Sequence, residues 1–188
     1  MAGFESWADF AREVITRRLA GRDTHDLPAP AAEARPQRAF GGVFVTLRGH
    51  GGLRACMGTL RTDVHLSDAV RQAAINAAEL DPRFGPLNPA ELSDLEVDVA
   101  VLSPLEPLKC IEEIEIGRDG VLVSRGEMCG LFLPQVAVEH GWDRRTLLDR
   151  CCSEKAGLPA AAWQDAATDV RRFTVEVHHE RRRDGARG

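Results

Sequence analysis

The sequence GVFVTLRGHGGLRACMGTL, residues 42–60, contains the pattern on which the fold prediction rests. Apolar side chains occupy alternate positions before and after a glycine-rich segment, a pattern typical of two half-buried strands joined by a tight turn. The alternating residues are Val43, Val45 and Leu47 before the turn, and Leu53, Ala55 and Met57 after it. The pattern therefore predicts a β-hairpin whose second strand carries Arg54, Cys56 and Gly58 on the face away from the core.

Helices and further strands flank this hairpin along the chain. Residues 4–19 and 66–80 have apolar residues at helical spacing, and Gly21 and Pro82 follow them as stop signals. The other predicted elements are strands over 95–102, 131–133 and 171–178 and a second hairpin over 111–125. Two further helices are predicted, one that begins at Pro134 and one that Asp143 caps and that runs over residues 144–156. Because hairpins are interleaved with helices, without strict strand–helix–strand units, we expect an α+β fold with mainly antiparallel sheet and flanking helices.

Composition limits the classes of protein that fit. With 188 residues and 44% hydrophobic residues, we expect a single domain over residues 1–180 and a disordered basic tail over 181–188. The net charge of -5 predicts at most weak, salt-dependent RNA binding. The chain lacks both an apolar run of membrane-spanning length and a secretory signal at its start, which favours a cytoplasmic protein without membrane contact. Five scattered cysteines indicate reduced thiols.

Arg54 and Cys56 are the first candidates for chemistry. A guanidinium fixed near a thiol favours the thiolate, which is the form that attacks electrophiles. They are therefore candidate catalytic residues, and Gly58 would leave room for a ligand to approach the backbone. The spacing alone fits a plainer alternative better, in which Cys56 is a small packed residue and Arg54 is a charge at the strand edge. The nearest candidate general base is His50, in the turn.

The segment DPRFGPL, residues 81–87, is the second candidate. Its rigid turn would hold Asp81 and Arg83 as a clamp for an anionic or amide-bearing ligand, with Phe84 packed beneath. The alternative is structural: Asp81 satisfies turn amides and Arg83 pairs with a nearby carboxylate. The chain contains no Cys-x-x-Cys or His-x-x-x-His pair, so we expect no metal site, and no motif indicates a cofactor.

The two candidates are predicted to meet in space. Only residues 61–65 separate the second strand of the hairpin from the following helix, so the helix is expected to pack back across the sheet. The end of that helix at Asp81 would then bring Arg83 or Phe84 toward Cys56.

Six motifs occur in the order and approximate spacing of the family named for the AMMECR-one protein, whose prokaryotic members are called AmmeMemoRadiSam system protein A. The motifs are GVFVTLR, LRACMG, DPRFGPL, IGRDGVLV, LFLPQVAVEHGWD, and KAGL followed by a Trp. The resemblance covers residues 4–178 and implies two α+β lobes with a cleft between them. The family signature LRGCIG is matched at Arg54 and Cys56, whereas Ala55 and Met57 replace the usual glycine and isoleucine.

The resemblance also implies partners and further site residues. Leu133 and Pro134 match the third family motif and are expected to close the ligand cleft. Members of this family resemble components of a three-part system with a radical S-adenosylmethionine (SAM) protein and a Memo-type protein, and the resemblance implies no particular reaction.

Two hypotheses on function follow. In the first, the chain is an enzyme or accessory subunit that binds a small molecule or peptide; Arg54 and Arg83 hold the ligand's negative charge, and Cys56 is a nucleophile or carrier. In the second, it is a non-catalytic regulatory or nucleotide- or RNA-binding module, and Cys56 only lines the site.

Overall fold

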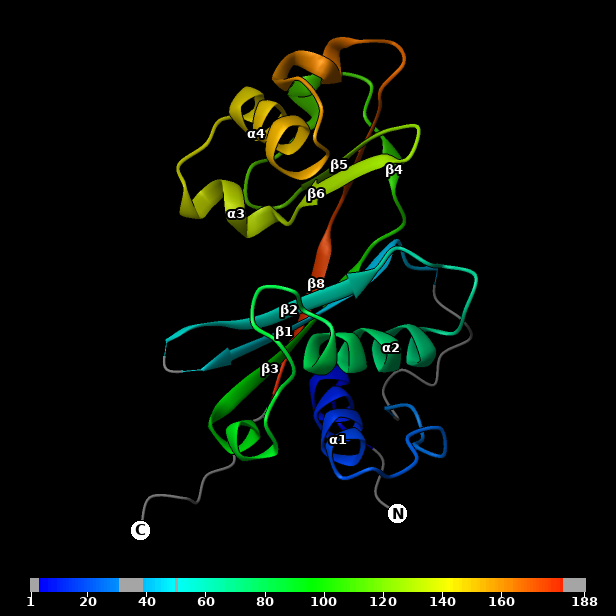
Figure 1. Cartoon of the computed structure of the whole chain (residues 1–188). Helices are drawn as coiled ribbons and strands as arrows, with labels where there is room; N and C mark the ends of the chain where they lie inside the picture. Colours follow the sequence, from blue (N-terminus) through cyan, green and yellow to red (C-terminus); the bar gives the residue numbers. More distant parts are fainter. Residues whose placement is uncertain (1–3, 31–38, 50, 181–188) are drawn as a thin grey trace. The chain divides into compact units, whose positions relative to one another are not determined.

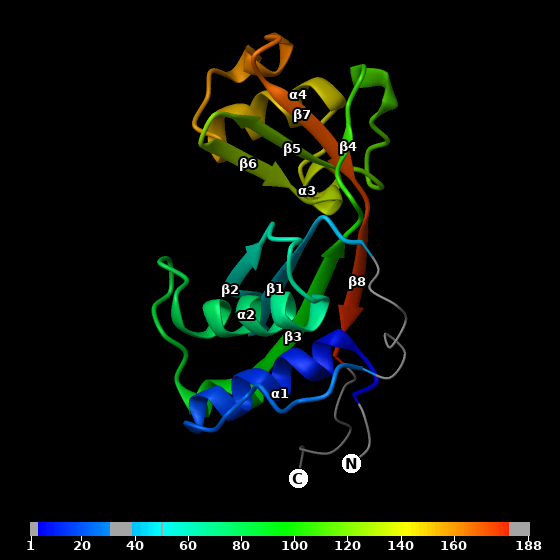
Figure 2. The ribbon, with the colours of Figure 1, turned by 90° about the vertical axis from the view of Figure 1, so that its right-hand side faces the viewer.

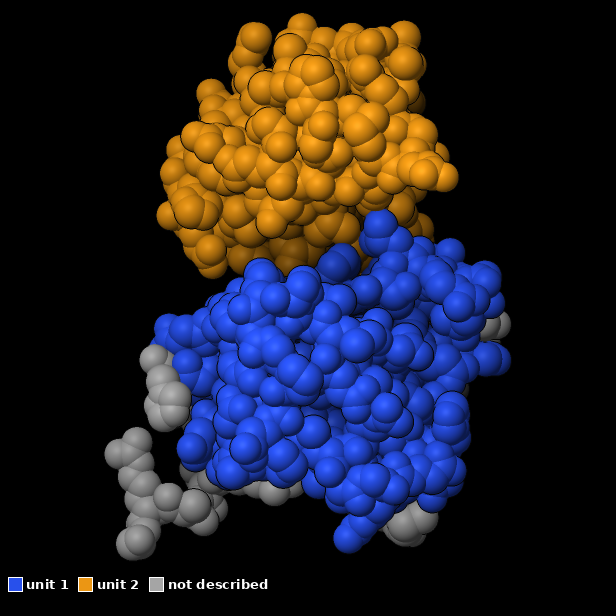
Figure 3. Space-filling view, viewed as in Figure 1, with its two compact units in different colours: residues 1–101, 176–188 blue, residues 102–175 orange. Residues whose placement is uncertain are grey.

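The computed structural model describes residues 4–30, 39–49 and 51–180. The chain forms two compact units, which Figure 3 colours separately: unit 1 comprises Met1–Val101 and Glu176–Gly188, and unit 2 comprises Leu102–Val175. Unit 2 is thus inserted into the sequence of unit 1. The tail predicted to be disordered, 181–188, lies outside the described residues.

Unit 1 is built on a four-stranded sheet in the order β2-β1-β3-β8. Its strands are β1 (Gly42–Gly49), β2 (Gly52–Thr59), β3 (Leu95–Leu102) and β8 (Val175–His179). β1 and β2 form the predicted antiparallel hairpin, and Thr46 lies opposite Cys56 in its register. β2 is therefore an edge strand, with β1 on one side only.

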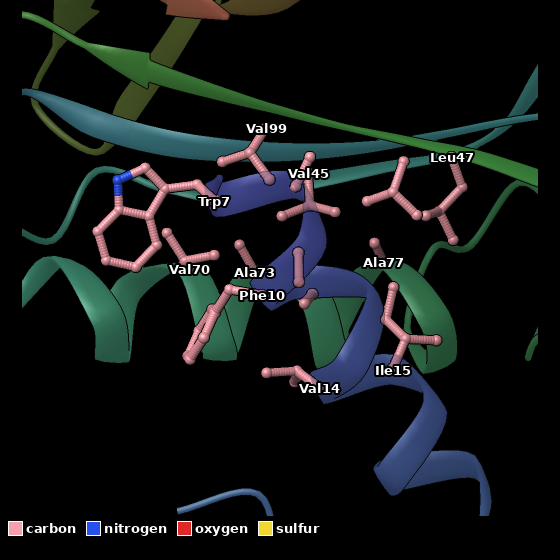
Figure 4. Close-up of a cluster of buried hydrophobic side chains, with 14 of the residues drawn as sticks. Trp7, Phe10, Val14, Ile15, Val45, Leu47, Val70, Ala73, Ala77 and Val99 are labelled. Atoms are coloured by element: carbon pink, nitrogen blue, oxygen red, sulfur yellow. The ribbon is translucent and has the colours of Figure 1, made fainter. Parts of the chain in front are cut away.

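Two helices cover one face of this sheet, as Figures 1 and 2 show. They are α1 (Trp7–Leu19) and α2 (Leu66–Glu79), close to the two helices predicted from apolar spacing. Ser6 caps α1 by accepting the N–H of Asp9. Figure 4 shows the core that the helices share with the sheet: Trp7, Phe10, Val14 and Ile15 of α1, Val70, Ala73 and Ala77 of α2, and Val45, Leu47 and Val99 of the strands. This burial holds α2, and hence the turn after it, against the hairpin.

Unit 2 contains a second sheet, in the order β4-β7-β5-β6. Its strands are β4 (Glu106–Pro107), β5 (Gly120–Arg125), β6 (Met128–Phe132) and β7 (Asp169–Phe173), and the paired strands are antiparallel. The helical elements are η3 (Ile111–Glu113), α3 (Pro134–Glu139), α4 (Arg144–Arg150), the π-helix η4 (Cys151–Lys155) and η5 (Ala160–Gln164).

The prediction of a second hairpin over residues 111–125 is wrong for its first strand. β5 pairs with β6, through a turn in which Gly126 has a φ of 60°. The segment expected to be that strand instead begins with the single 3-10 turn η3. Ile111 and Ile114 are three residues apart, which is one turn of a 3-10 helix, and both pack on the core of unit 2. The spacing of Ile111 and Ile114 is therefore that of a helical turn and not of a strand.

The architecture confirms the α+β class and the antiparallel pairing. Unit 2 begins and ends beside β3 and β8, where Ser103 N–H donates to Thr174 O at 2.9 Å. In the described part of the chain, no helix has the length and apolar character needed to cross a membrane.

Candidate functional site

The second strand of the hairpin is not regular, because it contains a β-bulge at Arg54. Leu47 pairs with Ala55 and Arg48 pairs with Leu53, so β2 has one residue more than β1 at this point. A bulge turns the extra residue away from strict alternation. Ala55 is fully buried, as predicted, whereas Leu53 is 39% exposed and lies outside the core. The predicted alternation is therefore interrupted at Arg54, because Leu53 and Ala55 do not share the core face.

Arg54 is held by the segment that follows the second helix. Its Nε donates to Glu91 Oε2 at 2.7 Å, and its two terminal nitrogens donate to the carbonyls of Gly85 and Pro86 at 3.4 Å each. The Arg54 side chain is 18% exposed. The pairing also lowers the pKa of the Glu91 carboxyl, chiefly through the hydrogen bond from Arg54. Arg54 therefore joins β2 to residues 85–91, and none of its hydrogen bonds in the described chain goes to the Cys56 thiol.

Arg83 is the guanidinium that reaches Cys56. Its Nε and Nη2 hold both oxygens of Asp81, at 2.9 and 2.7 Å, and Nη2 also donates to Cys56 O at 3.3 Å. Asp81 Oδ2 accepts the N–H of Cys56 at 2.9 Å. The predicted meeting of the 81–87 turn with Cys56 is confirmed. Because β2 is an edge strand, these two side chains take the place of a neighbouring strand at Cys56.

The buried carboxylate of Asp81 is stabilised in its charged form. Asp81 is 2% exposed. The hydrogen bonds from Arg83 lower the pKa of Asp81 well below its usual range, opposed by burial and aided by the N–H groups of Cys56 and Arg83. These contacts match the structural alternative for the 81–87 turn, in which Asp81 accepts backbone N–H groups and Arg83 pairs with a carboxylate. Arg83 remains about half exposed, and it lies 5.2 Å from the centre of the Phe84 ring.

The Cys56 thiol is half-buried and has a hydroxyl partner. Thr46 Oγ1 donates to Cys56 Sγ at 3.4 Å, across the hairpin. His50, considered as a general base, lies outside the described residues. In the described chain the thiol therefore has an uncharged hydrogen-bond partner and not a base.

Gly58 has a packing role that the sequence did not reveal. A Cβ on Gly58 would lie 2.3 Å from Phe44 Cδ1 and 2.4 Å from Val43 O. The space expected to admit a ligand at this backbone is thus filled by Phe44. Leu133 and Pro134 lie in unit 2, at the start of α3, whereas every contact described above is made within unit 1. Their contribution to a ligand site stays a prediction.

Sequence reasoning missed two residues of this site, Thr46 and Glu91. The hairpin register, once its turn is assigned, would have placed Thr46 beside Cys56. Glu91 forms a capping box with Asn88, an N-x-x-E signal readable in the sequence, but its pairing with Arg54 is set by the fold. Among the described residues, no three His, Cys, Asp or Glu side chains are grouped so that they could hold a metal ion.

The fold and these contacts define an α+β protein with a half-buried cysteine on a clamped edge strand. The AMMECR1 family model matches residues 8–178, so the chain belongs to the AMMECR1 family. A protein of Methanothermobacter thermautotrophicus is 44% identical, with 90% of each chain covered. Protein TK0174 of Thermococcus kodakarensis is 39% identical, covering 94% of this chain and 91% of that protein.

A solved structure supports the fold directly. The crystal structure of protein PH0010 from Pyrococcus horikoshii is similar with a TM-score of 0.80 and 37% identity. The similarity covers 93% of this chain and 89% of that chain. The AMMECR-type fold is therefore supported by both the sequence comparison and the solved structure.

Proposed function

We propose that the surface around Cys56 is the ligand site of an AmmeMemoRadiSam protein A-like subunit that acts with a radical SAM protein and a Memo-type protein. A small molecule or peptide with a negative charge would bind beside the thiol. Cys56 would then serve as a nucleophile or as the carrier of a modification.

One observation carries this proposal: Arg83 still has hydrogen-bonding capacity next to Cys56. Its Nε and Nη2 are used by Asp81 and Cys56, while Nη1 makes no hydrogen bond to the described residues. Phe84, which is 40% exposed, offers an apolar surface beside the same guanidinium. An anionic group could accept from Nη1 without breaking the clamp on the strand. Arg54, in contrast, uses four of its five N–H donors on Glu91, Gly85 and Pro86, so its role within the described chain is structural.

The test is binding of purified radical SAM and Memo-type proteins of the three-part system, together with intact-mass analysis of Cys56. We expect Arg83→Ala to weaken binding by about tenfold or more, as is usual when a charged hydrogen bond is lost. Arg61→Ala is the matched control, because Arg61 is an exposed arginine paired with Asp63 away from the site. Unchanged binding in Arg83→Ala, or an equal loss in Arg61→Ala, would contradict the proposal.

A second function is favoured by the surroundings of the thiol. The partner of Cys56 is a hydroxyl, and both nearby arginines are paired with carboxylates. That arrangement also suits a non-catalytic regulatory or nucleotide- or RNA-binding module. Cys56→Ala separates the two functions. If Cys56 only lines the site, the variant retains full ligand or partner binding and full activity of the three-part system. If the thiol takes part in chemistry, the variant abolishes that activity.

A further inference from the structure

The outer edge of β2 has one residue, Gly58, whose backbone groups are without partners in the described chain. The N–H and C=O of Cys56 turn outward, to Asp81 and Arg83. In an antiparallel ladder the backbone groups of alternate residues turn to the same side, so those of Gly58 also turn outward. No described residue accepts its N–H or donates to its C=O. The edge is therefore open at Gly58, where it offers one donor and one acceptor.

The turn after α2 closes the rest of this edge. Toward the start of β2, the hydrogen bonds of Arg54 hold residues 85–91 against the strand. At Cys56 the guanidinium of Arg83 takes the place of a neighbouring strand. A chain added to the edge can therefore pair only from Gly58 onward, and it has to end where it meets Arg83. A continuous strand, such as one from a second copy of this chain, cannot pass that point.

Charge determines which end of a chain fits beside Arg83. Its guanidinium is about half exposed with Nη1 free of hydrogen bonds to the described residues, whereas its partner Asp81 is buried. A carboxylate is attracted to this guanidinium and an ammonium is repelled. A strand antiparallel to β2 runs from Leu60 toward Cys56, so its carboxyl end reaches Arg83. A parallel strand would place its amino end there.

Exposed apolar side chains flank the same edge. Leu60 follows β2 directly and is 36% exposed, and Phe84, beside Arg83, is 40% exposed. Both can be covered by apolar side chains of an added strand. The unpartnered backbone pair, the guanidinium and these side chains together fit an extended peptide that ends in an apolar residue.

We infer that the edge of β2 binds the carboxyl terminus of such a peptide. The penultimate residue exchanges two hydrogen bonds with Gly58, and the last residue, about 3.3 Å further along, brings its carboxylate to Arg83. This inference rests on the proposed function for the ligand site beside Arg83, and it names the class of ligand. It requires neither chemistry at Cys56 nor a particular protein partner.

The experiment measures the affinity of the full chain for fluorescein-labelled hexapeptides by fluorescence anisotropy. The peptides carry the label at the amino end and finish in Val-Thr-Val, Val-Thr-Leu or Val-Thr-Phe, each as the free acid and as the carboxyl amide. We expect the acids to bind about tenfold more tightly than the amides, and Arg83→Ala to remove this difference. Arg48→Ala is the matched control and should keep it, because Arg48 is a half-exposed arginine paired with Asp98 on the inner strand of the hairpin.

Methylated peptides test the backbone pairing without any change to the protein. N-methylation of the penultimate residue removes the N–H that would donate to Gly58 O, and it should lower the affinity about tenfold. The N–H of the last residue points away from β2 in an antiparallel strand. N-methylation of that residue is therefore the control, and it should change the affinity less than about threefold.

Several outcomes would overturn the inference. They are equal binding of acids and amides, an equal loss from the two methylations, and no binding of any peptide at about 1 mM. A dimer in sedimentation that Arg83→Ala dissociates and the peptides leave intact would assign the edge to a second copy instead.

The peptide measurements also separate this inference from the proposed function. If the peptides bind as expected while Arg83→Ala binds the radical SAM and Memo-type proteins normally, the proposed function fails and the peptide site stands. If Arg83→Ala loses those partners but no peptide binds the natural protein, this inference alone fails.

Discussion

Cys56 in unit 1 and Cys151 in unit 2 are both free cysteines, but their surroundings differ in kind. Cys56 is half-buried among a hydroxyl, a carboxylate and a guanidinium. Cys151 is fully buried in the core of unit 2, and burial raises the pKa of its thiol to about 12. The fold thus places polar groups around one cysteine and packs the other into an apolar core. Cys56 is partly exposed to solvent, whereas Cys151 is enclosed.

The largest effect expected from this difference is in thiol labelling. At pH 7 we expect iodoacetamide to modify Cys56 about 100-fold faster than Cys151 or Cys152, because the latter are 0% exposed and must wait for local opening. Tryptic peptides 55–61 and 151–155 report the two regions separately in one digest. Equal rates under native conditions would break the comparison and remove Cys56 as a candidate nucleophile.

A second effect concerns the clamp on the edge strand. Asp81→Asn removes the charge that pairs with Arg83 and weakens the acceptor of the Cys56 N–H. We expect the free energy of unfolding to fall by about 2 kcal/mol, with the exposure of Arg83 keeping the loss below that of a fully buried pair.

Urea unfolding measures this loss, and Asp63→Asn is its control. Asp63 is 69% exposed where it pairs with Arg61, so its replacement should cost less than about 0.5 kcal/mol. If the two variants lose similar free energies of unfolding, the contacts of Asp81 with Arg83 and the Cys56 N–H do not stabilise the strand.

A third, somewhat smaller effect tests the packing beside Cys56. A Cβ at Gly58 would meet both Phe44 and a backbone oxygen, so Gly58→Ala should destabilise unit 1 by about 1.5 kcal/mol. Gly52→Ala, on the same strand, is the control, since the nearest atom to its Cβ would be 3.8 Å away. Denaturant unfolding distinguishes the two variants, and a neutral Gly58→Ala would contradict the close packing of Phe44 and the Val43 carbonyl on Gly58.

The smallest effect is acid sensitivity. Because folding lowers the pKa of Asp81, its contribution to stability is complete above the unfolded pKa of about 4 and is lost as the pH falls below that value. The stability difference between the natural protein and Asp81→Asn should therefore narrow progressively between pH 4 and pH 2. The free energy of unfolding of both proteins is measured across this pH range. A difference that stays constant would show that the stability contributed by Asp81 does not depend on its protonation.

The sequence predicted most of unit 1 because its elements follow local rules. Alternation located the hairpin, and helical spacing located α1 and α2. The short connection between hairpin and helix predicted that Arg83 or Phe84 would approach Cys56, and Arg83 does. The bulge at Arg54 could not be predicted in this way, because a bulge depends on the register between two strands. The partner of Arg54, Glu91, is 37 residues along the chain and was therefore also hidden.

Unit 2 was predicted less well for a related reason. Residues 113–116 alternate Glu and Ile as a strand does, but Ile111 and Ile114 are three residues apart and pack on the core from a 3-10 turn. The helix beginning after Asp143 was expected to continue, yet it widens into the π-helix η4 at Cys151. In both segments tertiary packing determines which of two local structures forms, and the sequence pattern does not distinguish them.

The insertion of unit 2 between β3 and β8 has a consequence for evolution and engineering. The two chain crossings are adjacent, since Ser103 and Thr174 are joined by backbone hydrogen bonding. A short turn could therefore connect β3 to β8 directly and leave the sheet of unit 1 closed in the same order. Removal of unit 2 at these two crossings would leave in place every contact described for Cys56, because all of them are made within unit 1.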